Sequence, residues 1–492
     1  MTRTNPGTAP DIVTDVLVVG YGGAGAAAAV EAHDRGADVL IVEKMPEGGG
    51  STRESAGSIG SVARRDAAIE HYLALTKGRT PRPLVETFVD GLDGLGDWFR
   101  ANGSELVPFA MWEPIFPHRK QGSAYPDLPG SGGIGLRLRV PAEAGEQGGE
   151  SLWAFLSGNV SRRGIRVLTG APAQRLLVDA AGAVYGVEVR HEGRPRRVIA
   201  RRGVCLTCGG YNYGGELLRD AVGVHLPALS PPGRNTGDGI RMAQAAGADL
   251  WHMNCVVSTF GYTFEGEDAA FLALMPAYGF FVVDQAGRRF VDETAVENHA
   301  AAQILLVPDI RTGDLPRLPS VIVFDEKTRL AGRVALLEIG ENRRYPWSAD
   351  NSAEIAKGWI RRAGTLQELA GQLGLPAGAL VETARRYNAA AVSGGDDHAR
   401  PVSRMAVLDT PPYYAIPVWP ALFNTQGGPR RDERARILRP DGSPIPRLYS
   451  AGELGSMWAT LYPGAGNVSE GIVYGRIAGR AAAAQPPYAG PA

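Results

Sequence analysis

The sequence predicts an α/β fold in which a domain built on a parallel sheet is interrupted by an inserted α+β domain. Near the N-terminus, residues 15–43 read as a strand, a glycine-rich turn, an alanine-rich helix and a second strand. From Trp251 to about Thr410 the chain instead carries aromatic strands and polar helices. After that segment, strands followed by glycine-rich turns return. We therefore expect one discontinuous domain over residues 1–250 and 408–492 and an inserted domain over residues 251–407.

Length and charge exclude several classes of function. A chain of 492 residues can hold two or three domains. Its 51 basic and 52 acidic residues give a net charge of −1, which indicates no nucleic-acid partner. The polar first ten residues lack the apolar core of a signal peptide, and no run of eighteen apolar residues follows. We expect a soluble, cytoplasmic protein without a membrane span.

The three cysteines, Cys205, Cys208 and Cys255, are too few for a disulfide scaffold and fit a reducing compartment. Cys205 and Cys208 form a C-x-x-C pair, which could serve redox chemistry or metal binding. The surrounding segment GVCLTCGGY is more typical of a buried strand that runs into a turn. We therefore expect no metal site.

A G-x-G-x-x-G motif, formed by Gly20, Gly22 and Gly25, lies between the strand predicted at 15–19 and the helix predicted at 24–35. Glycines at this spacing permit a tight turn and a close approach of a pyrophosphate to the N–H groups at the helix N-terminus. Glu43 follows the second strand, 18 residues after Gly25, where an acidic side chain binds ribose hydroxyls. These features predict a Rossmann-type dinucleotide site.

Further segments distinguish FAD from NAD. EGGGSTRESAGS follows the second strand at once, where an NAD domain would start another helix. CGGY, NTGDGIRMAQAAGADL and RLYSAGELGS come later, and GAGNVSEGIVYGRIAG opens a terminal helix. Together these motifs resemble flavoproteins of the fumarate reductase/succinate dehydrogenase type, in the branch of the 3-ketosteroid dehydrogenases. The resemblance spans nearly the whole chain and implies a Rossmann-type FAD-binding domain with an inserted substrate-capping domain.

The resemblance also implies roles in cofactor binding. Glu43 binds the adenosine ribose, Asp238 and Glu453 hold sugar hydroxyls, and Asn467 and Val468 present helix N–H groups to the flavin ring, where they stabilise its anionic reduced form. The early glycine and serine run contains no histidine, so we expect noncovalent FAD. The residues expected to bind the cofactor are Gly20, Gly22, Gly23, Ala24, Gly25, Glu43, Lys44, Gly50, Ser51, Thr52, Gly57, Ala173, Gly209, Gly210, Asp238, Glu453, Asn467 and Val468.

The segment from Tyr462 to Gly466 matches the Tyr-Pro-Gly-x-Gly motif of the ketosteroid dehydrogenase branch. The resemblance implies that the Tyr462 hydroxyl and the Gly466 N–H hold the ketone oxygen of the substrate. Two donors on one oxygen stabilise the enolate that forms when the α-proton leaves. A purely structural role, in which Tyr462 packs over the turn, is the alternative.

The base that removes the α-proton is less defined. The related branch uses a tyrosine, and at the matching position this chain has Glu297, with His299 two residues on. A desolvated carboxylate with a raised pKa can abstract such a proton. Glu297 as a solvated residue of the inserted domain is the alternative.

Three positions depart from the fumarate reductases. Asn424 begins Asn-Thr-Gln-Gly-Gly where that branch has His-Thr-x-Gly-Gly, and Glu297 stands where an acid-donating arginine is expected. Tyr462-Pro463 replaces the arginine before the terminal glycines. At these positions a dicarboxylate would find little cationic support.

The segment from 105 to 149 is too long for a simple connection and is rich in aromatic residues, so we expect it to cover the substrate. An ordinary surface loop is the alternative. The residues expected to contact the substrate are Trp112, Phe116, Arg119, Tyr125, His299 and Asn424.

The sequence thus predicts an FAD-dependent dehydrogenase that introduces a double bond next to a ketone, a cyclic ketone or a 3-ketosteroid. Hydride passes to flavin N5, and an external acceptor (quinone, dye or O2) reoxidises the flavin. The alternatives are an ene-reductase of the fumarate reductase type, acting on an unsaturated acid or ketone, and a non-catalytic flavin-binding protein.

Overall fold

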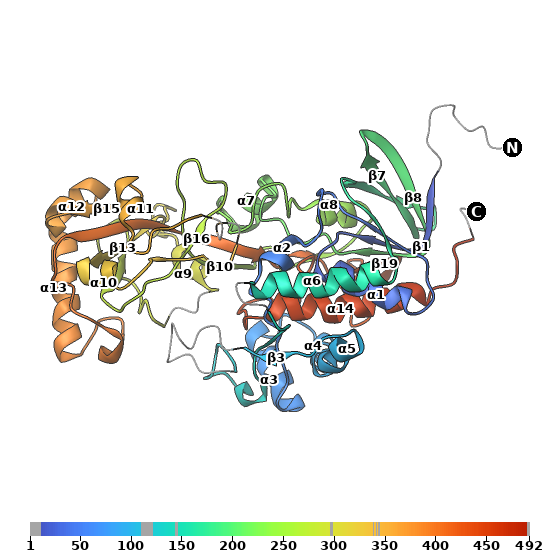
Figure 1. Ribbon diagram of the computed structural model, residues 1–492, viewed down its shortest axis with the longest axis horizontal. Helices are drawn as coiled ribbons and strands as arrows, with labels where there is room; N and C mark the ends of the chain where they lie inside the picture. The colour runs from blue at the N-terminus through green and yellow to red at the C-terminus, as the bar shows by residue number, and fades with distance from the viewer. Residues whose placement is uncertain are drawn as a thin grey trace. The chain divides into compact units, whose positions relative to one another are not determined.

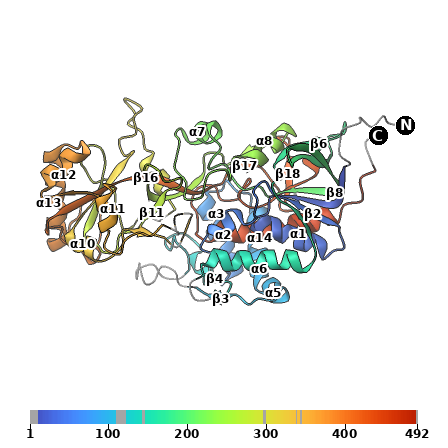
Figure 2. The same cartoon turned by 45° about the horizontal axis from the view of Figure 1, so that its top comes forward.

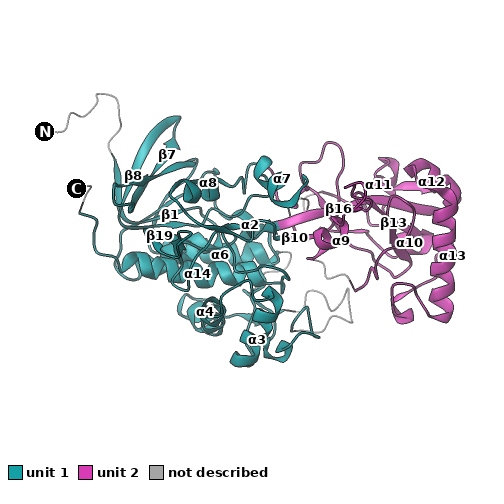
Figure 3. Ribbon diagram, turned by 180° about the vertical axis from the view of Figure 1, so that it is seen from behind, with its two compact units in different colours: residues 1–225, 233–256, 424–492 teal, residues 226–232, 257–423 magenta. Residues whose placement is uncertain are grey.

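The computed structural model describes residues 11–109, 122–142, 146–295, 299–337, 339–340, 342 and 345–489. The chain divides into two compact units (Figure 3). Unit 1 comprises residues 1–225, 233–256 and 424–492, and unit 2 comprises residues 226–232 and 257–423. Within the described ranges, no helix is both long and apolar enough to cross a bilayer.

Unit 1 contains most of the helices and the larger sheet. Its helices are α1 (Gly23–His33), α2 (Gly50–Glu54), α3 (Arg65–Thr76), α4 (Arg82–Asp93), α5 (Leu95–Ala101), α6 (Gly148–Arg162), α7 (Glu216–Val222), α8 (Asp238–Ala245) and α14 (Gly466–Ala483). Its strands are β1 (Ile12–Val19), β2 (Val39–Val42), β3 (Val107–Pro108), β4 (Leu138–Arg139), β5 (Arg166–Leu168), β6 (Ala173–Val178), β7 (Val184–His191), β8 (Arg194–Leu206), β9 (Leu250–Trp251), β17 (Gly428–Pro429), β18 (Arg436–Leu438) and β19 (Pro444–Ser450).

The larger sheet has the strand order β18-β19-β8-β1-β2-β5, and β6 and β7 extend it from β8. Strands β19, β8, β1, β2 and β5 are parallel, with Val16 opposite Val39 in the β1–β2 pair. The central strands read as continuous apolar runs because both faces of a parallel sheet are covered. This sheet confirms the strand–turn–helix–strand interpretation of residues 15–43.

Helices α1, α6 and α14 lie side by side in both ribbon views (Figures 1 and 2). Alanines and glycines allow α1 and α14 to pack with their backbones in contact. A Cβ on Gly475 or Gly479 would collide with the carbonyl oxygen of Ala24 or Ala28. This close approach fixes the N-terminus of α14 relative to the glycine turn before α1.

Unit 2 is built on a second, mostly antiparallel sheet with the strand order β12-β13-β16-β10-β11-β14, and β15 pairs with β16. Strands β10 and β16 extend past the boundary with unit 1. The strands are β10 (Val256–Tyr262), β11 (Phe271–Ala273), β12 (Phe280–Val283), β13 (Ser320–Asp325), β14 (Ala335–Leu336), β15 (Arg361–Ala363) and β16 (Tyr413–Thr425). The helices are α9 (Ala301–Leu305), α10 (Glu326–Leu330), α11 (Ser352–Ala356), α12 (Leu366–Leu373) and α13 (Ala377–Ser393).

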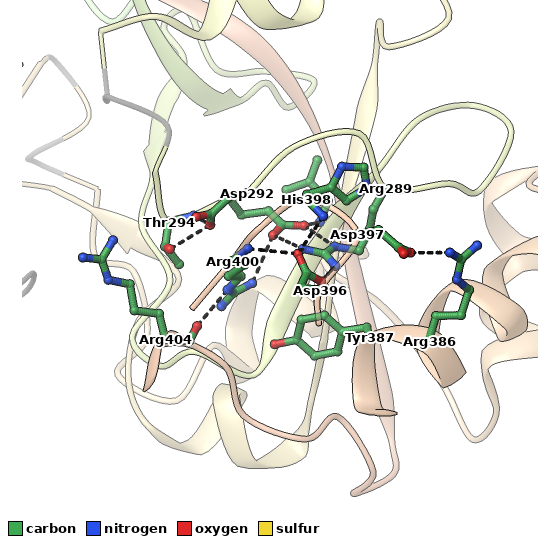
Figure 4. Close-up of polar contacts among 12 residues, drawn as sticks. Arg289, Asp292, Thr294, Arg386, Tyr387, Asp396, Asp397, His398, Arg400 and Arg404 are labelled. Atoms are coloured by element: carbon green, nitrogen blue, oxygen red, sulfur yellow. Dashed lines mark hydrogen bonds and ion pairs between the residues drawn. The ribbon is translucent and has the colours of Figure 1, made fainter. Parts of the chain in front are cut away.

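A buried ionic network is a prominent feature of unit 2 (Figure 4). Glu293 accepts hydrogen bonds from Arg289 (2.8 Å) and Arg400 (3.1 Å), and Arg289 also pairs with Asp396. All four side chains are at most 6% exposed. Both guanidinium groups also lie over the ring of Tyr387. Each buried charge in this network therefore has a partner of opposite sign.

Candidate active site and cofactor site

The turn between β1 and α1 has the geometry that the glycine motif predicts. Gly20 has a φ of +105°, and a Cβ there would lie 2.5 Å from the Thr207 carbonyl oxygen. The Gly23 N–H donates to Thr52 Oγ1 at 3.0 Å, and a Cβ on Gly23 would lie 2.8 Å from that oxygen. The backbone at the α1 N-terminus is therefore bare, as an approaching phosphate requires.

Glu43 and Lys44 follow β2 and organise the adjacent loops. Glu43 accepts hydrogen bonds from the Tyr21 N–H through Oε2 and from the Met45 N–H through Oε1, both at 2.8 Å. Lys44 Nζ contacts Asp238 Oδ2 at 3.1 Å. The structure thus joins the end of β2 to the start of α8 through the pair of Lys44 and Asp238.

A second cluster joins three distant segments around Glu453. Asn235 Nδ2 donates to Ser51 Oγ (3.0 Å) and lies 3.5 Å from Glu453 Oε2. Side chains at Gly209 and Gly210 would collide with Asn235 and with the Thr425 hydroxyl. The cluster therefore has a bare backbone beside a carboxylate and an amide, which suits a polyhydroxylated chain.

Burial raises the pKa of the Glu453 carboxyl to about 8, although hydrogen bonds from Ser51 and the Gly210 N–H oppose the shift. Solvent still reaches part of the residue. In low-dielectric surroundings, hydrogen bonds from hydroxyl donors strongly stabilise the charged form of an accessible carboxylate. Glu453 fits the predicted role toward the sugar hydroxyls of FAD.

The turn from Tyr462 to Asn467 leads into α14. Ala465 has a φ of +58°, and a Cβ on Gly466 would lie 2.8 Å from the Trp458 ring and 2.9 Å from that of Tyr462. The Asn467 N–H donates to Tyr462 Oη at 2.9 Å. The sequence assigned this N–H to the flavin ring, whereas here it bonds to the phenol.

The bond from Asn467 has a chemical consequence for Tyr462. Because its oxygen accepts that bond, the hydroxyl proton can be donated in another direction. Burial raises the pKa of Tyr462 well above its usual value, although the hydrogen bond from Asn467 and the charge of Arg137 act against the shift. Tyr462 is therefore protonated at neutral pH and is a donor rather than a base.

Asn424 and Gln426 lie in the segment that replaces the His-Thr-x-Gly-Gly motif. Gln426 and Asn467 exchange two side-chain hydrogen bonds, of 3.1 and 2.9 Å. Asn424 is 5% exposed, and its Nδ2 has no hydrogen-bond partner among the described residues. A buried amide donor without a partner is costly, so a ligand atom is a reasonable partner for Asn424.

The remaining predicted residues have varied surroundings. Gly57 has a φ of +64°, and a Cβ there would collide with Gly148, so packing alone explains this glycine. Ala173 begins β6, and Val468 packs on the core of unit 1. The other cofactor residues, Ala24, Gly22, Gly25, Gly50 and Thr52, lie in or beside the two glycine-rich turns.

Several predicted substrate contacts cannot be placed. Trp112, Phe116, Arg119 and Glu297 lie outside the described residues. His299 belongs to unit 2, where its ring lies 5.3 Å from that of Phe423. In unit 1, the Tyr125 N–H donates to Ser123 Oγ at 2.9 Å, and the ring packs against the core.

The C-x-x-C pair lies where a strand runs into a turn, as the sequence predicts, with Cys205 buried and Cys208 half-buried. Cys205 belongs to β8, and burial raises the pKa of both Cys205 and Cys208 to about 12. The described residues contain no cluster of three or more potential metal ligands from histidine, cysteine, aspartate or glutamate. A thiol with so high a pKa is a poor nucleophile.

Sequence reasoning missed two residues of these sites, Asn235 and Arg137. Asn235 lies inside the NTGD segment and has a φ of +47°, which is unusual for a residue other than glycine. Arg137 contacts the Tyr462 turn from a distant part of the chain. The quoted NTGD motif could have pointed to Asn235, whereas no local pattern indicates Arg137.

Comparisons with known proteins are consistent with this cofactor site. Residues 15–469 match the model of the FAD binding domain family, and the chain belongs to this family. A 3-oxosteroid 1-dehydrogenase from Mycobacterium tuberculosis is 28% identical, covering 94% of this chain and 97% of its own. A 4-oxocyclohexanecarboxylate 2-dehydrogenase from Sinomonas cyclohexanicum is 27% identical, covering 97% and 94%. A cytochrome fumarate reductase from Shewanella frigidimarina is 28% identical, covering 97% and 78%.

The fold has a close counterpart among solved structures. The 3-ketosteroid delta1-dehydrogenase from Sterolibacterium denitrificans superposes with a TM-score of 0.82 at 23% identity, covering 96% of this chain and 99% of that one. The solved structure confirms the predicted fold class, the curated relatives confirm the resemblance to the ketosteroid dehydrogenase branch, and the family model confirms FAD as the cofactor.

Proposed function

We propose that this member of the FAD binding domain family is an FAD-dependent dehydrogenase that desaturates a ketone between its α and β carbons. The observation that carries the proposal is the Tyr462 turn, where the phenol oxygen accepts the Asn467 N–H and the ring lies against Gly466 at the start of α14. Two relatives whose names denote dehydrogenation of a ring beside an oxo group support the choice of reaction.

Each step of the proposed reaction is assigned to particular residues of the chain. Tyr462 and the Gly466 N–H hold the ketone oxygen and stabilise the negative charge that develops on it as the α-proton leaves. Glu297 takes that proton, with His299 as the alternative base. Bound FAD supplies the acceptor for the β-hydride. Asn424 offers its buried amide to the substrate.

The cofactor and the substrate follow from the same reasoning. FAD binds noncovalently, held by the glycine turn before α1 and by Glu43, Asp238 and Glu453. The substrate is a cyclic ketone, which includes 3-ketosteroids. An external acceptor such as a quinone, a dye or O2 reoxidises the flavin, and the enzyme acts in the cytoplasm.

The test is anaerobic mixing of the holoenzyme with saturated cyclic ketones, followed through the flavin absorbance. We expect bleaching, and we expect Tyr462→Phe to slow it by about 100-fold or more with FAD still bound. Tyr72→Phe is the matched control, since Tyr72 is also a tyrosine against Trp458, with ring centroids 5.3 Å apart compared with 6.2 Å for Tyr462. A Tyr462→Phe rate equal to that of the wild type contradicts the assignment.

The rival reaction is the reverse one, reduction of an unsaturated acid or ketone. The same flavin assay separates the two, because a reductase would reoxidise reduced flavin with the enone and would not bleach with the ketone. A protein that only binds flavin would respond to neither substrate.

A further inference from the structure

Arg137 lies against the Tyr462 turn although it is 326 residues away from Pro463 in the sequence. Its Nη2 donates to the Pro463 carbonyl oxygen at 3.2 Å. Gly464, with a φ of +70°, makes room for it, since a Cβ there would lie 2.5 Å from the same nitrogen. The guanidinium is therefore seated on the turn that carries the proposed ketone donor.

Arg137 has no ion-pair partner among the residues that the structure describes, although it is shielded from part of the solvent. Fully buried arginines elsewhere are neutralised. Arg431 pairs with Glu470, and Arg400 and Arg289 pair with Glu293 in the network of Figure 4. A half-buried cation without a counter-ion beside a candidate active site is the usual setting for an anionic ligand.

The chemistry of the guanidinium narrows the choice of anion. An arginine has five N–H donors in a fixed fork, and Arg137 uses one nitrogen on a backbone carbonyl. The remaining donors match a planar carboxylate, which they can bind in a bidentate manner. The sequence lacks an arginine before the terminal glycines, and Arg137 brings a guanidinium to this turn from another segment.

We propose that Arg137 binds a carboxylate of the substrate, so that the enzyme acts on a cyclic oxo acid rather than on a neutral ketone. This inference rests on the proposed function, because Tyr462 must hold the ketone of the same molecule. Arg137 is then the residue that determines specificity, and Tyr462 holds the reacting end.

The first experiment measures binding without turnover. The enone 4-oxocyclohex-2-ene-1-carboxylate and its methyl ester are titrated into oxidised holoenzyme, and Kd is read from the change in the flavin spectrum. We expect the acid to bind about 100-fold more tightly than the ester, and Arg137→Gln to remove this preference. Arg137→Lys keeps the positive charge but not the forked arrangement of N–H donors, so it should retain part of the preference for the acid.

The matched control is Arg64→Gln. Arg64 also donates to a single backbone carbonyl, that of Gly132 at 3.4 Å, but it is exposed. We expect this variant to bind acid and ester as the wild type does. If Arg137→Gln weakens acid and ester equally, the guanidinium supports the turn and the proposal is wrong.

The second experiment separates this inference from the proposed function. Flavin bleaching is followed with 4-oxocyclohexanecarboxylate and with its methyl ester. Bleaching by both at equal kcat/KM overturns the carboxylate inference and leaves the dehydrogenase proposal standing. Bleaching by neither these compounds nor other saturated cyclic ketones overturns the proposed function, and the inference that rests on it falls as well.

Discussion

Two glutamates of unit 1, Glu453 and Glu470, differ in how the protein satisfies them. Glu470 is fully buried and pairs with Arg431, and it accepts hydrogen bonds from Ser456 Oγ at 2.6 Å and from the Met457 N–H at 2.8 Å. Glu453 remains partly accessible and has no ion-pair partner among the described residues. Glu470 therefore has a cation as its partner, whereas the partners described for Glu453 are neutral hydrogen-bond donors, Ser51 and the Gly210 N–H.

The difference distinguishes a structural site from a ligand site. A carboxylate that protein groups fully satisfy contributes to the uniqueness of the fold. A carboxylate in low-dielectric surroundings without a cation is unfavourable in its charged form, and hydroxyl groups of a ligand stabilise it by adding hydrogen bonds. In a member of an FAD-binding family, sugar hydroxyls of the cofactor are suitable partners for Glu453.

The largest effect is expected where the satisfied carboxylate loses its partner. Arg431→Met leaves the buried Glu470 without its cation, so the carboxyl must stay charged and unpaired or take up a proton, and we expect the free energy of unfolding to fall by about 3–5 kcal/mol. Urea unfolding of the holoprotein, followed by tryptophan fluorescence, measures the change.

The double variant Arg431→Met/Glu470→Met is the control for this change. It removes both charges at once, so it should recover much of the lost stability. A loss below about 1 kcal/mol in the single variant would mean that the pair is not the buried ionic site described above.

An intermediate effect is expected at Glu453, and it should depend on pH. The folded apoprotein holds the proton up to a pKa of about 8, whereas the ordinary pKa of a glutamate is 4.5. Between these values the folded state binds more protons than the unfolded state, so stability falls as the pH rises through this window. Glu453→Gln removes this pH dependence. We expect the free energy of unfolding of this variant to exceed that of the wild type by about 1–3 kcal/mol at about pH 8.5, after allowance for solvent screening.

Unfolding of the FAD-free protein at about pH 4.5 and about pH 8.5 checks the prediction. We expect the two proteins to be similar at the lower pH, where Glu453 is protonated in the folded state and about half protonated in the unfolded state, so that little of the pH-dependent difference remains. Glu70→Gln, an exposed position on α3, serves as the control and should show no such window. An equal effect at both pH values would mean that the ionised carboxylate is not the unfavourable species.

The contrast also shows what the sequence can and cannot predict. The glycine turn and Glu43 were predictable because the requirement is local: a strand, a tight turn and a helix follow one another in the chain. The parallel pairing of β1 with β2 confirms this interpretation. Glu453 was found through its motif, but its lack of a cation emerged only when distant segments were placed around it.

Arg137 and the Asn467 N–H show the limit of motif reasoning. The motif before α14 lacks an arginine, and a guanidinium nevertheless reaches it through a tertiary contact that no local pattern encodes. Residues 82–101 likewise form two helices, α4 and α5, separated at Gly94. Contacts between residues that are distant in the sequence, such as that of Arg137 with Pro463, become visible only in the folded structure.

The smallest effect is expected at the amide pair of Gln426 and Asn467. Like Glu470, these side chains find their partners within the protein, but the pair lies beside the Tyr462 turn. Gln426→Leu removes two hydrogen bonds and leaves the Asn467 N–H on Tyr462. If the pair is structural, the free energy of unfolding should fall by about 1–2 kcal/mol and the bleaching rate should change by less than about tenfold. A rate that falls by about 100-fold at unchanged stability would instead place Gln426 among the residues that contact the substrate.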